Sequence, residues 1–206
     1  MRVCYSFRWR LGSFFGLVFV LLALAAQANA QSPESPITKL ERLRWFVNST
    51  VGPTSLGVGI VSSGWGTWMD KPGEYGTHWA GSAKRYGMRL SGVSAGNAIE
   101  AGLGIATNED PRYFPSVGNG SWQRVRHAAA MTLMAHRSDG RITPAYARYA
   151  GIVGNNFLSN AWRAPSESTV NSALIRTGLG FTGRFVSNLF DEFRGDFLRR
   201  KGFSTK

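Results

Sequence analysis

The segment GVSAGNAIEAGLGI, from Gly92 to Ile105, contains one charged residue, Glu100, among mainly glycine, alanine and aliphatic residues. Four of its fourteen residues are glycines. Each glycine inside a helix costs roughly 1 kcal/mol relative to alanine, so a helix with this composition needs a compensating contact. Gly92 and Gly96, four residues apart, supply one, because they leave a groove in which a second backbone can approach closely.

Two further segments carry small residues at helical spacing. One is the series Ala147, Gly151, Asn155 and Ser159, and the other is the pair Gly180 and Gly183. Small residues at such intervals allow helices to cross at short distance. We therefore expect three helices to meet through glycine-rich crossings.

Glu100 follows Gly96 by four residues and so lies near the groove. We expect its partner to be a basic residue on a neighbouring helix, and the candidates are Arg148, Arg176 and Arg184. In this interpretation Gly92, Gly96, Glu100, Arg176 and Arg184 have a structural role. The alternative is that Glu100 acts as an acid or base in a reaction.

Helical periodicity dominates the rest of the chain. Thr38 and Glu41 form a capping box that starts a helix, and this helix should fail before Pro53. Further helices are expected over residues 75–89, 92–106, 122–136 after a cap at Ser121, 143–162 with Thr143 and Pro144 as the start signal, and from Ser166 or Ser168 to about 200, with a loop over 108–121. The expected fold is mainly α, a single domain of about five to seven packed helices over residues 31–206, preceded by a signal peptide.

The first thirty residues have the pattern of a secretory signal peptide. Three arginines precede an apolar run from Phe14 to Ala26, and Ala28-Asn29-Ala30 supplies a small-x-small cleavage site. A signal peptide would direct export of the chain to the periplasm or an envelope membrane surface. Its cleavage after Ala30 would remove the one cysteine of the chain, Cys4. An uncleaved N-terminal anchor is the alternative.

The charge balance favours anionic partners. The chain has a formal net charge of +12, which becomes +9 when the three arginines of residues 1–30 are removed. We expect an anionic membrane surface or another envelope component as partner, and no nucleic acid because the chain is exported. A solvated basic surface is the alternative. The sequence leaves open the oligomeric state and whether the charge-free run from Trp45 to Met69 inserts into a membrane.

Catalytic motifs are scarce. His127 and His136 are nine residues apart and would lie on opposite faces of one helix, so we expect no metal site and no cofactor. The catalytic candidates are an acid–base pair of Glu100 and His127, and the carboxylates Glu109 and Asp110 with Arg112. Asp110-Pro-Arg112 is more typical of a structured turn in which the aspartate caps and the arginine is held.

Several stretches resemble a family of small exported bacterial proteins with no assigned activity. They are ERLRWFVNSTVGP, KRYGMRLSGVSAGNAIEAGLG, EDPRYF, TPAYARYAGIVGNNFLSNAWRA and FVSNLFDEF. The resemblance covers residues 38–200 and implies that these stretches belong to one fold. It implies no activity, cofactor or catalytic residue.

Two functions are therefore open. The first is a non-enzymatic helical envelope protein, associated with a membrane surface. The second is an envelope enzyme that acts on a lipid or cell-wall substrate with Glu100, His127 and Asp110. A Glu100–arginine pair enclosed by the fold favours the first, and convergence of these groups on one open pocket favours the second.

Overall fold

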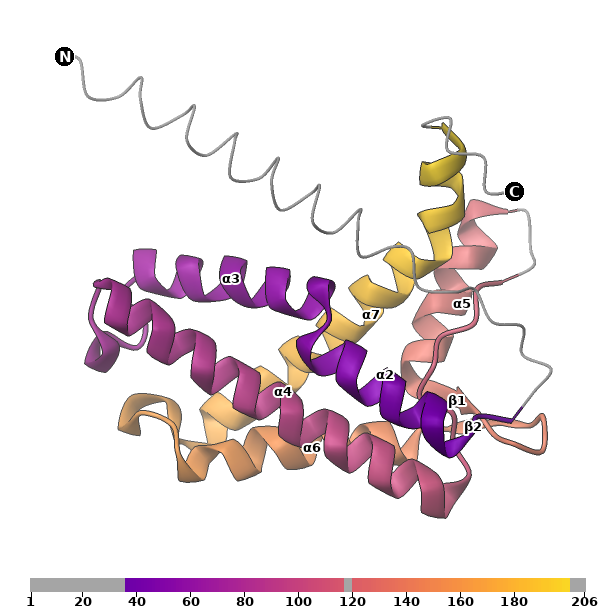
Figure 1. The fold of residues 1–206 in the computed structure, drawn as a ribbon, viewed down its shortest axis with the longest axis horizontal. Coiled ribbons are helices and arrows are strands. Elements are labelled where there is room, and N and C mark those ends of the chain that lie inside the picture. Colours follow the sequence, from indigo (N-terminus) through magenta and orange to yellow (C-terminus); the bar gives the residue numbers. More distant parts are fainter. Residues whose placement is uncertain (1–35, 117–119, 201–206) are drawn as a thin grey trace. The chain divides into compact units, whose positions relative to one another are not determined.

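The structure, a computed structural model, describes residues 36–116 and 120–200 and is mainly helical (Figure 1). Its helices are α2 (Lys39–Val51), α3 (Pro53–Trp68), α4 (Trp79–Thr107), α5 (Ser121–Leu133), α6 (Tyr146–Leu158) and α7 (Val170–Arg200), and its strands are β1 (Met134–His136) and β2 (Ile142–Pro144). The expected α class and number of helices are thus confirmed for the described ranges. The signal peptide, with its cleavage site after Ala30, lies outside the described residues.

The described chain forms two compact units. One consists of residues 47–90, and the other of residues 36–46 together with 91–116 and 120–200. Helices α2 and α4 contribute residues to both. The single domain over residues 31–206 stays a prediction, and each unit is described by itself below.

The capping box at the start of α2 is formed as expected. The Glu41 N–H donates to Thr38 Oγ1 at 3.2 Å, and the Thr38 N–H donates to Glu41 Oε2 at 2.8 Å. Helix α2 ends at Val51, and Pro53 occupies the start of α3, where a missing N–H costs nothing. The charge-free run from Trp45 to Met69 is therefore divided between two helices.

None of the helices in the described ranges is both long enough and apolar enough to cross a membrane.

The two helical segments expected over 75–89 and 92–106 are one continuous helix, α4, of 29 residues. It begins at Trp79 rather than at Tyr75, because Gly73–Tyr75 forms a 3-10 turn and Gly76 then adopts a positive φ of 71°. The glycines of the central stretch do not interrupt it.

A small hairpin replaces the expected end of one helix and start of the next. Helix α5 ends at Leu133, not at His136, and β1 pairs antiparallel with β2 so that Ala135 faces Thr143. Thr143 and Pro144 therefore belong to a strand, and α6 begins only after Ala145. A strand of three residues is too short to show the alternation of apolar and polar residues by which strands are recognised in a sequence. The pairing of β1 with β2 also cannot be read from helical periodicity.

Two predicted helix caps were wrong by one to three residues. Helix α5 has Gly120 as its N-cap, so Ser121 lies inside the helix. Thr169 caps α7 by accepting a hydrogen bond from the Ser172 N–H at 3.1 Å. Ser166 and Ser168 instead belong to the turn at Pro165–Glu167, where the Ser168 hydroxyl donates to the Pro165 carbonyl at 3.0 Å.

The predicted glycine-rich crossing is formed between α4 and α6. A Cβ atom added to Gly96 would lie 3.2 Å from the Gly151 carbonyl oxygen, and one added to Gly151 would lie 2.7 Å from the Gly96 oxygen. Gly92 lies against Asn155 in the same way, at 3.2 Å from its Oδ1. Gly183 does not take part, since a Cβ there would have no heavy atom within 4 Å. Spacing along a helix predicts a small-residue face, and only packing decides which part of that face is covered.

Candidate functional site: a buried cluster of carboxylates and arginines

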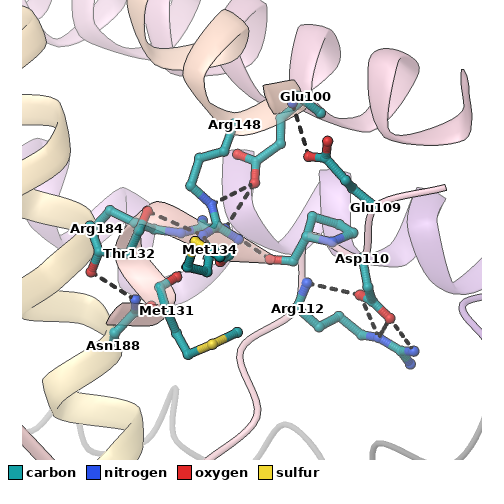
Figure 2. Close-up of polar contacts among 12 residues, drawn as sticks. Glu100, Glu109, Asp110, Arg112, Met131, Thr132, Met134, Arg148, Arg184 and Asn188 are labelled. Carbon is teal, nitrogen blue, oxygen red and sulfur yellow. Dashed lines mark hydrogen bonds and ion pairs between the residues drawn. The ribbon is translucent and has the colours of Figure 1, made fainter. Parts of the chain in front are cut away.

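Glu100 lies at the centre of a polar cluster inside the unit that contains residues 91–200 (Figure 2). Its Oε1 accepts hydrogen bonds from Arg148 Nε of α6 at 3.1 Å and from Arg184 Nη2 of α7 at 3.0 Å. The Glu100 and Arg148 side chains are 7% and 3% exposed, and that of Arg184 is 20% exposed. One carboxylate thus joins three helices, and two of the three expected partners are correct.

Arg148 also serves the C-terminal end of α5. Its Nη1 donates to the carbonyl oxygens of Met131 at 2.6 Å, Thr132 at 3.3 Å and Met134 at 3.0 Å. The last carbonyls of a helix have no partner within the helix, and a cation there is favourable. Burial, followed by the nearby charge of Arg184, lowers the pKa of Arg148 to about 10, so the guanidinium stays charged at neutral pH.

Arg184 connects the cluster to the loop that follows α4. Its Nη2 donates to the Pro111 carbonyl oxygen at 2.8 Å. Its guanidinium also lies over the ring of Trp45, 5.9 Å from the centroid, in a cation–π contact. The Arg184 guanidinium therefore contacts the Glu100 carboxylate, the Pro111 carbonyl oxygen and the Trp45 ring.

Glu109 caps the beginning of α6. Its Oε2 accepts a hydrogen bond from the Ala147 N–H at 2.9 Å, which satisfies one of the unpaired amides of the first turn. The Glu109 carbonyl oxygen accepts a second bond from Arg42 Nη2 of α2 at 2.8 Å. Glu109 is 3% exposed, so this cap is part of the interior.

Asp110 and Arg112 form the structured turn that the sequence indicates. Asp110 Oδ1 accepts the Arg112 N–H at 2.9 Å, and Oδ2 accepts Arg112 Nη2 at 2.6 Å. Arg112 also pairs with Glu41 of α2 at 3.4 Å. These two catalytic candidates are therefore bound to each other.

His127 is not part of the cluster around Glu100. Its Nε2 lies 3.0 Å from the Phe114 carbonyl oxygen, and its ring centroid lies 5.9 Å from that of Tyr113. Over the ranges that the structure describes, no hydrogen bond or ion pair joins His127 to Glu100. The acid–base pair drawn from these two residues is not formed.

The prediction that Arg176 could be a partner of Glu100 was wrong. Arg176 does not pair with Glu100 but donates to the Asn156 carbonyl oxygen at 2.9 Å and to the Glu167 carbonyl oxygen at 2.6 Å. Arg176 lies two turns before Arg184 on the same helix, so both face the same side. Helical periodicity predicts which face of a helix a residue lies on, but it does not predict which other element packs against that face at each turn.

A further buried carboxylate, Glu192, was missed by the sequence prediction. Its side chain is fully buried and accepts hydrogen bonds from the Tyr113 hydroxyl, from the Ser116 N–H at 3.0 Å and from Arg124 Nε at 3.2 Å. Burial and the bond to Glu192 raise the pKa of Tyr113. Glu192 follows Arg184 by eight residues and so lies near the same helix face, which is the signal that was available.

The space enclosed by the cluster is small. Its lining includes Glu100, Glu109, Asp110 and Arg148, and it leaves no room for a water molecule. Among the described residues there is also no group of three or more histidine, cysteine and carboxylate side chains that could hold a metal ion. The arrangement joins five helices and a loop through hydrogen-bonded charges, and it leaves little space for a substrate.

Comparisons of the chain with models of known families, with curated proteins and with solved structures found no match. Fold and cluster together define a class, a mainly helical protein whose interior contains charged residues paired to one another.

Proposed function

We propose that this chain is a non-enzymatic helical protein of the cell envelope, exported and attached to an anionic membrane surface. The observation that carries the proposal is the distribution of side chains. Charged groups are paired inside the fold, and large apolar groups lie on its surface.

The buried apolar residues within the described ranges are mostly alanines, joined by Phe114 and Met131. Large apolar side chains are found instead among the exposed residues, for example Ile105 at 60% and Leu179 at 64%. Burial of apolar surface contributes about 25 cal/mol per Å², and extensive exposed apolar surface marks a site of interaction with a partner or a membrane. This distribution supports a function at an apolar boundary.

The charge supports a membrane as that boundary. With a formal net charge of +12, or +9 after the loss of residues 1–30, the chain is attracted to anionic headgroups, and each Lys or Arg near such a surface contributes about 1 kcal/mol. The resemblance to exported proteins and the predicted signal peptide are consistent with an envelope membrane. Export and location are part of the proposal.

The polar cluster supports a non-enzymatic role. A catalytic acid needs access to its substrate, whereas Glu100 is bound by two arginines and Asp110 by Arg112. For His127, the remaining candidate, the contact is Nε2 at 3.0 Å from the Phe114 carbonyl oxygen. These contacts are those of a structural network.

Cell fractionation tests the proposal. The protein should sediment with the membranes of expressing cells and should be released in part by a wash with about 1 M salt, where charge interactions are screened within about 3 Å. Protein purified from the same cells should co-sediment with vesicles that contain phosphatidylglycerol and bind less to vesicles of phosphatidylcholine alone. Recovery in the soluble fraction, with no binding to either vesicle, would contradict the proposal.

A further inference from the structure

Helix α3 of the unit formed by residues 47–90 has an inner face of small residues. A Cβ added to Gly59 would lie 2.7 Å from the ring of Tyr86, and one added to Gly66 would lie 3.1 Å from Arg85 Cδ. Ser63, between them, is buried, and its hydroxyl donates to the Gly59 carbonyl oxygen at 2.7 Å. These contacts place α3 alongside the first half of α4, as a helical hairpin (Figure 1).

The opposite face of α3 is apolar and exposed. Val58, Val61, Trp65 and Trp68 recur at intervals of three, four and three residues, which places them on one side of a helix. Trp65 and Trp68 are 61% and 64% exposed, and their ring centroids are 4.9 Å apart. Within the unit of residues 47–90, this apolar face of α3 therefore lies on the side opposite to α4.

The tip of this hairpin concentrates the exposed aromatic surface. Met69, which directly follows α3, is 45% exposed, and Trp79, which begins α4, is 85% exposed. Tryptophan is enriched at the boundary between the hydrocarbon and the headgroups of a bilayer, because its ring is apolar and its N–H can reach water. The composition of the tip therefore fits a bilayer interface.

The charges near the tip fit an anionic surface. Helix α3 contains no charged residue, and the nearby lysines Lys71 and Lys84 are exposed. The turn also carries two carboxylates, Asp70, which is paired with Arg85 at 3.3 Å, and Glu74, so that Lys71, Lys84 and Arg85 leave it with one positive charge in surplus. An apolar face bordered by lysines is the pattern of helices that lie in the surface of anionic membranes.

The turn is held in place before any ligand binds. Arg85 donates to the carbonyl oxygens of Lys71 at 2.9 Å, Pro72 at 2.8 Å and Gly76 at 2.6 Å. One buried guanidinium thus fixes the loop that joins the two helices. Trp68 and Trp79 are presented from an ordered turn, which lowers the entropy lost on binding.

We infer that the α3–α4 hairpin is the membrane-binding element of the protein. Its tip, Trp65, Trp68, Met69 and Trp79, enters the interfacial layer of an anionic phospholipid bilayer, with Lys71 and Lys84 at the phosphates. Helix α3, about 24 Å long at about 1.5 Å per residue, lies along the surface. This inference rests on the proposed function. It adds that the α3–α4 hairpin is the element that binds and that an anionic phospholipid is the ligand.

The test compares variants of the protein purified from expressing cells. The double variant Trp65→Ser/Trp68→Ser should bind phosphatidylglycerol vesicles at least about tenfold more weakly than wild type, since two interfacial aromatic anchors are lost. Trp122→Ser is the matched control, because Trp122 is 70% exposed on α5 of the other unit. It should bind as wild type does. Far-UV circular dichroism should be the same for all three.

Two further measurements sharpen the test. Lys71→Glu/Lys84→Glu should weaken binding to phosphatidylglycerol vesicles and remove most of its salt dependence. Brominated lipid should quench wild-type tryptophan fluorescence and should quench the Trp65/Trp68 double variant much less. If either result is absent although the wild type binds, the hairpin is not the membrane-binding element.

The outcomes separate this inference from the proposed function. Equal binding by wild type and the Trp65→Ser/Trp68→Ser variant overturns the hairpin and leaves membrane attachment intact. Failure of the wild type to bind any vesicle overturns both. A wild type that is a dimer in solution, with a double variant that is monomeric, would show that α3 faces a second copy of the chain and would overturn the inference.

Discussion

Replacing Glu100 by glutamine should lower the free energy of unfolding by about 2–3 kcal/mol, the range for hydrogen bonds to charged groups. The amide oxygen can still accept from Arg148 and Arg184, but the negative charge that offsets two guanidiniums is lost. Glu100→Leu should cost more, about 3–5 kcal/mol, because it leaves a buried charge unpaired. Arg148 sets this cost, since it is 3% exposed and cannot turn to water, whereas Arg184 is 20% exposed.

The double variant Glu100→Leu/Arg148→Met tests the same reasoning. Removing both partners of a buried pair usually recovers much of the loss. Recovery should be incomplete in this protein, because Arg148 also donates to three carbonyl oxygens at the end of α5. The double variant should therefore be more stable than Glu100→Leu and less stable than wild type.

Urea unfolding followed by circular dichroism measures these differences by linear extrapolation. Glu167→Gln is the control, because Glu167 forms a less buried pair with Arg163 on the same turn, at 2.9 Å. It should cost less than about 1 kcal/mol. If Glu100→Gln were as stable as wild type, or more stable, the structural role of Glu100 would be wrong. Loss of a cellular phenotype in that variant would then indicate a functional acid.

Three other predictions concern processing, packing and pH. Intact-mass analysis of the protein from expressing cells should place its N-terminus at Gln31, and retention of residues 1–30 would indicate an anchored protein. Gly96→Leu should cost several kcal/mol and Gly96→Ala less, because an added Cβ lies 3.2 Å from the Gly151 oxygen. Gly183→Ala, in open space, should be neutral or stabilising by up to about 1 kcal/mol, and thermal melts that rank these variants otherwise would contradict the crossing. Burial lowers the pKa of His136, so the unfolded state binds its proton more tightly. Stability should therefore fall as the pH drops below about 6.5, and His136→Gln should reduce this loss in urea melts at pH 7 and pH 5.5.

The unit formed by residues 36–46, 91–116 and 120–200 contains several buried carboxylates that are paired with arginines. Glu100 and Glu192, two of its buried carboxylates, each accept from an arginine on another helix. Such pairs contribute little net stability compared with apolar residues of the same size, but their geometry is specific. They join particular pairs of helices, while many large apolar side chains lie on the surface.

Local signals in the sequence predicted local structure well. Thr38 and Glu41 identified the start of α2, because both groups of a capping box are within four residues. The turn at Asp110–Arg112 was recognised for the same reason. Where the competing structure was not local, the prediction failed, as for the hairpin in which Ala135 pairs with Thr143.

The candidate site was predicted in part. Glu100 in a small-residue segment indicated a buried partner, since an isolated charge there needs compensation. Arg148 and Arg184 were correct and Arg176 was not, because all three satisfy the same condition of being basic residues on neighbouring helices. Glu192 was missed because the segment FDEF itself gives no sign of burial, and the one signal for it is its position near the helix face of Arg184.

The helical class, the presence of close crossings between small-residue helix faces and the need for a cation beside Glu100 could be predicted from the sequence. These follow from periodicity, side-chain size and charge, which act within one or two helical turns. Only the tertiary structure decided which arginines meet that carboxylate, which glycines are covered, and that Trp65 and Trp68 lie on the surface. Those properties depend on which elements pack together, and packing joins residues such as Glu100 and Arg184 that are 84 positions apart.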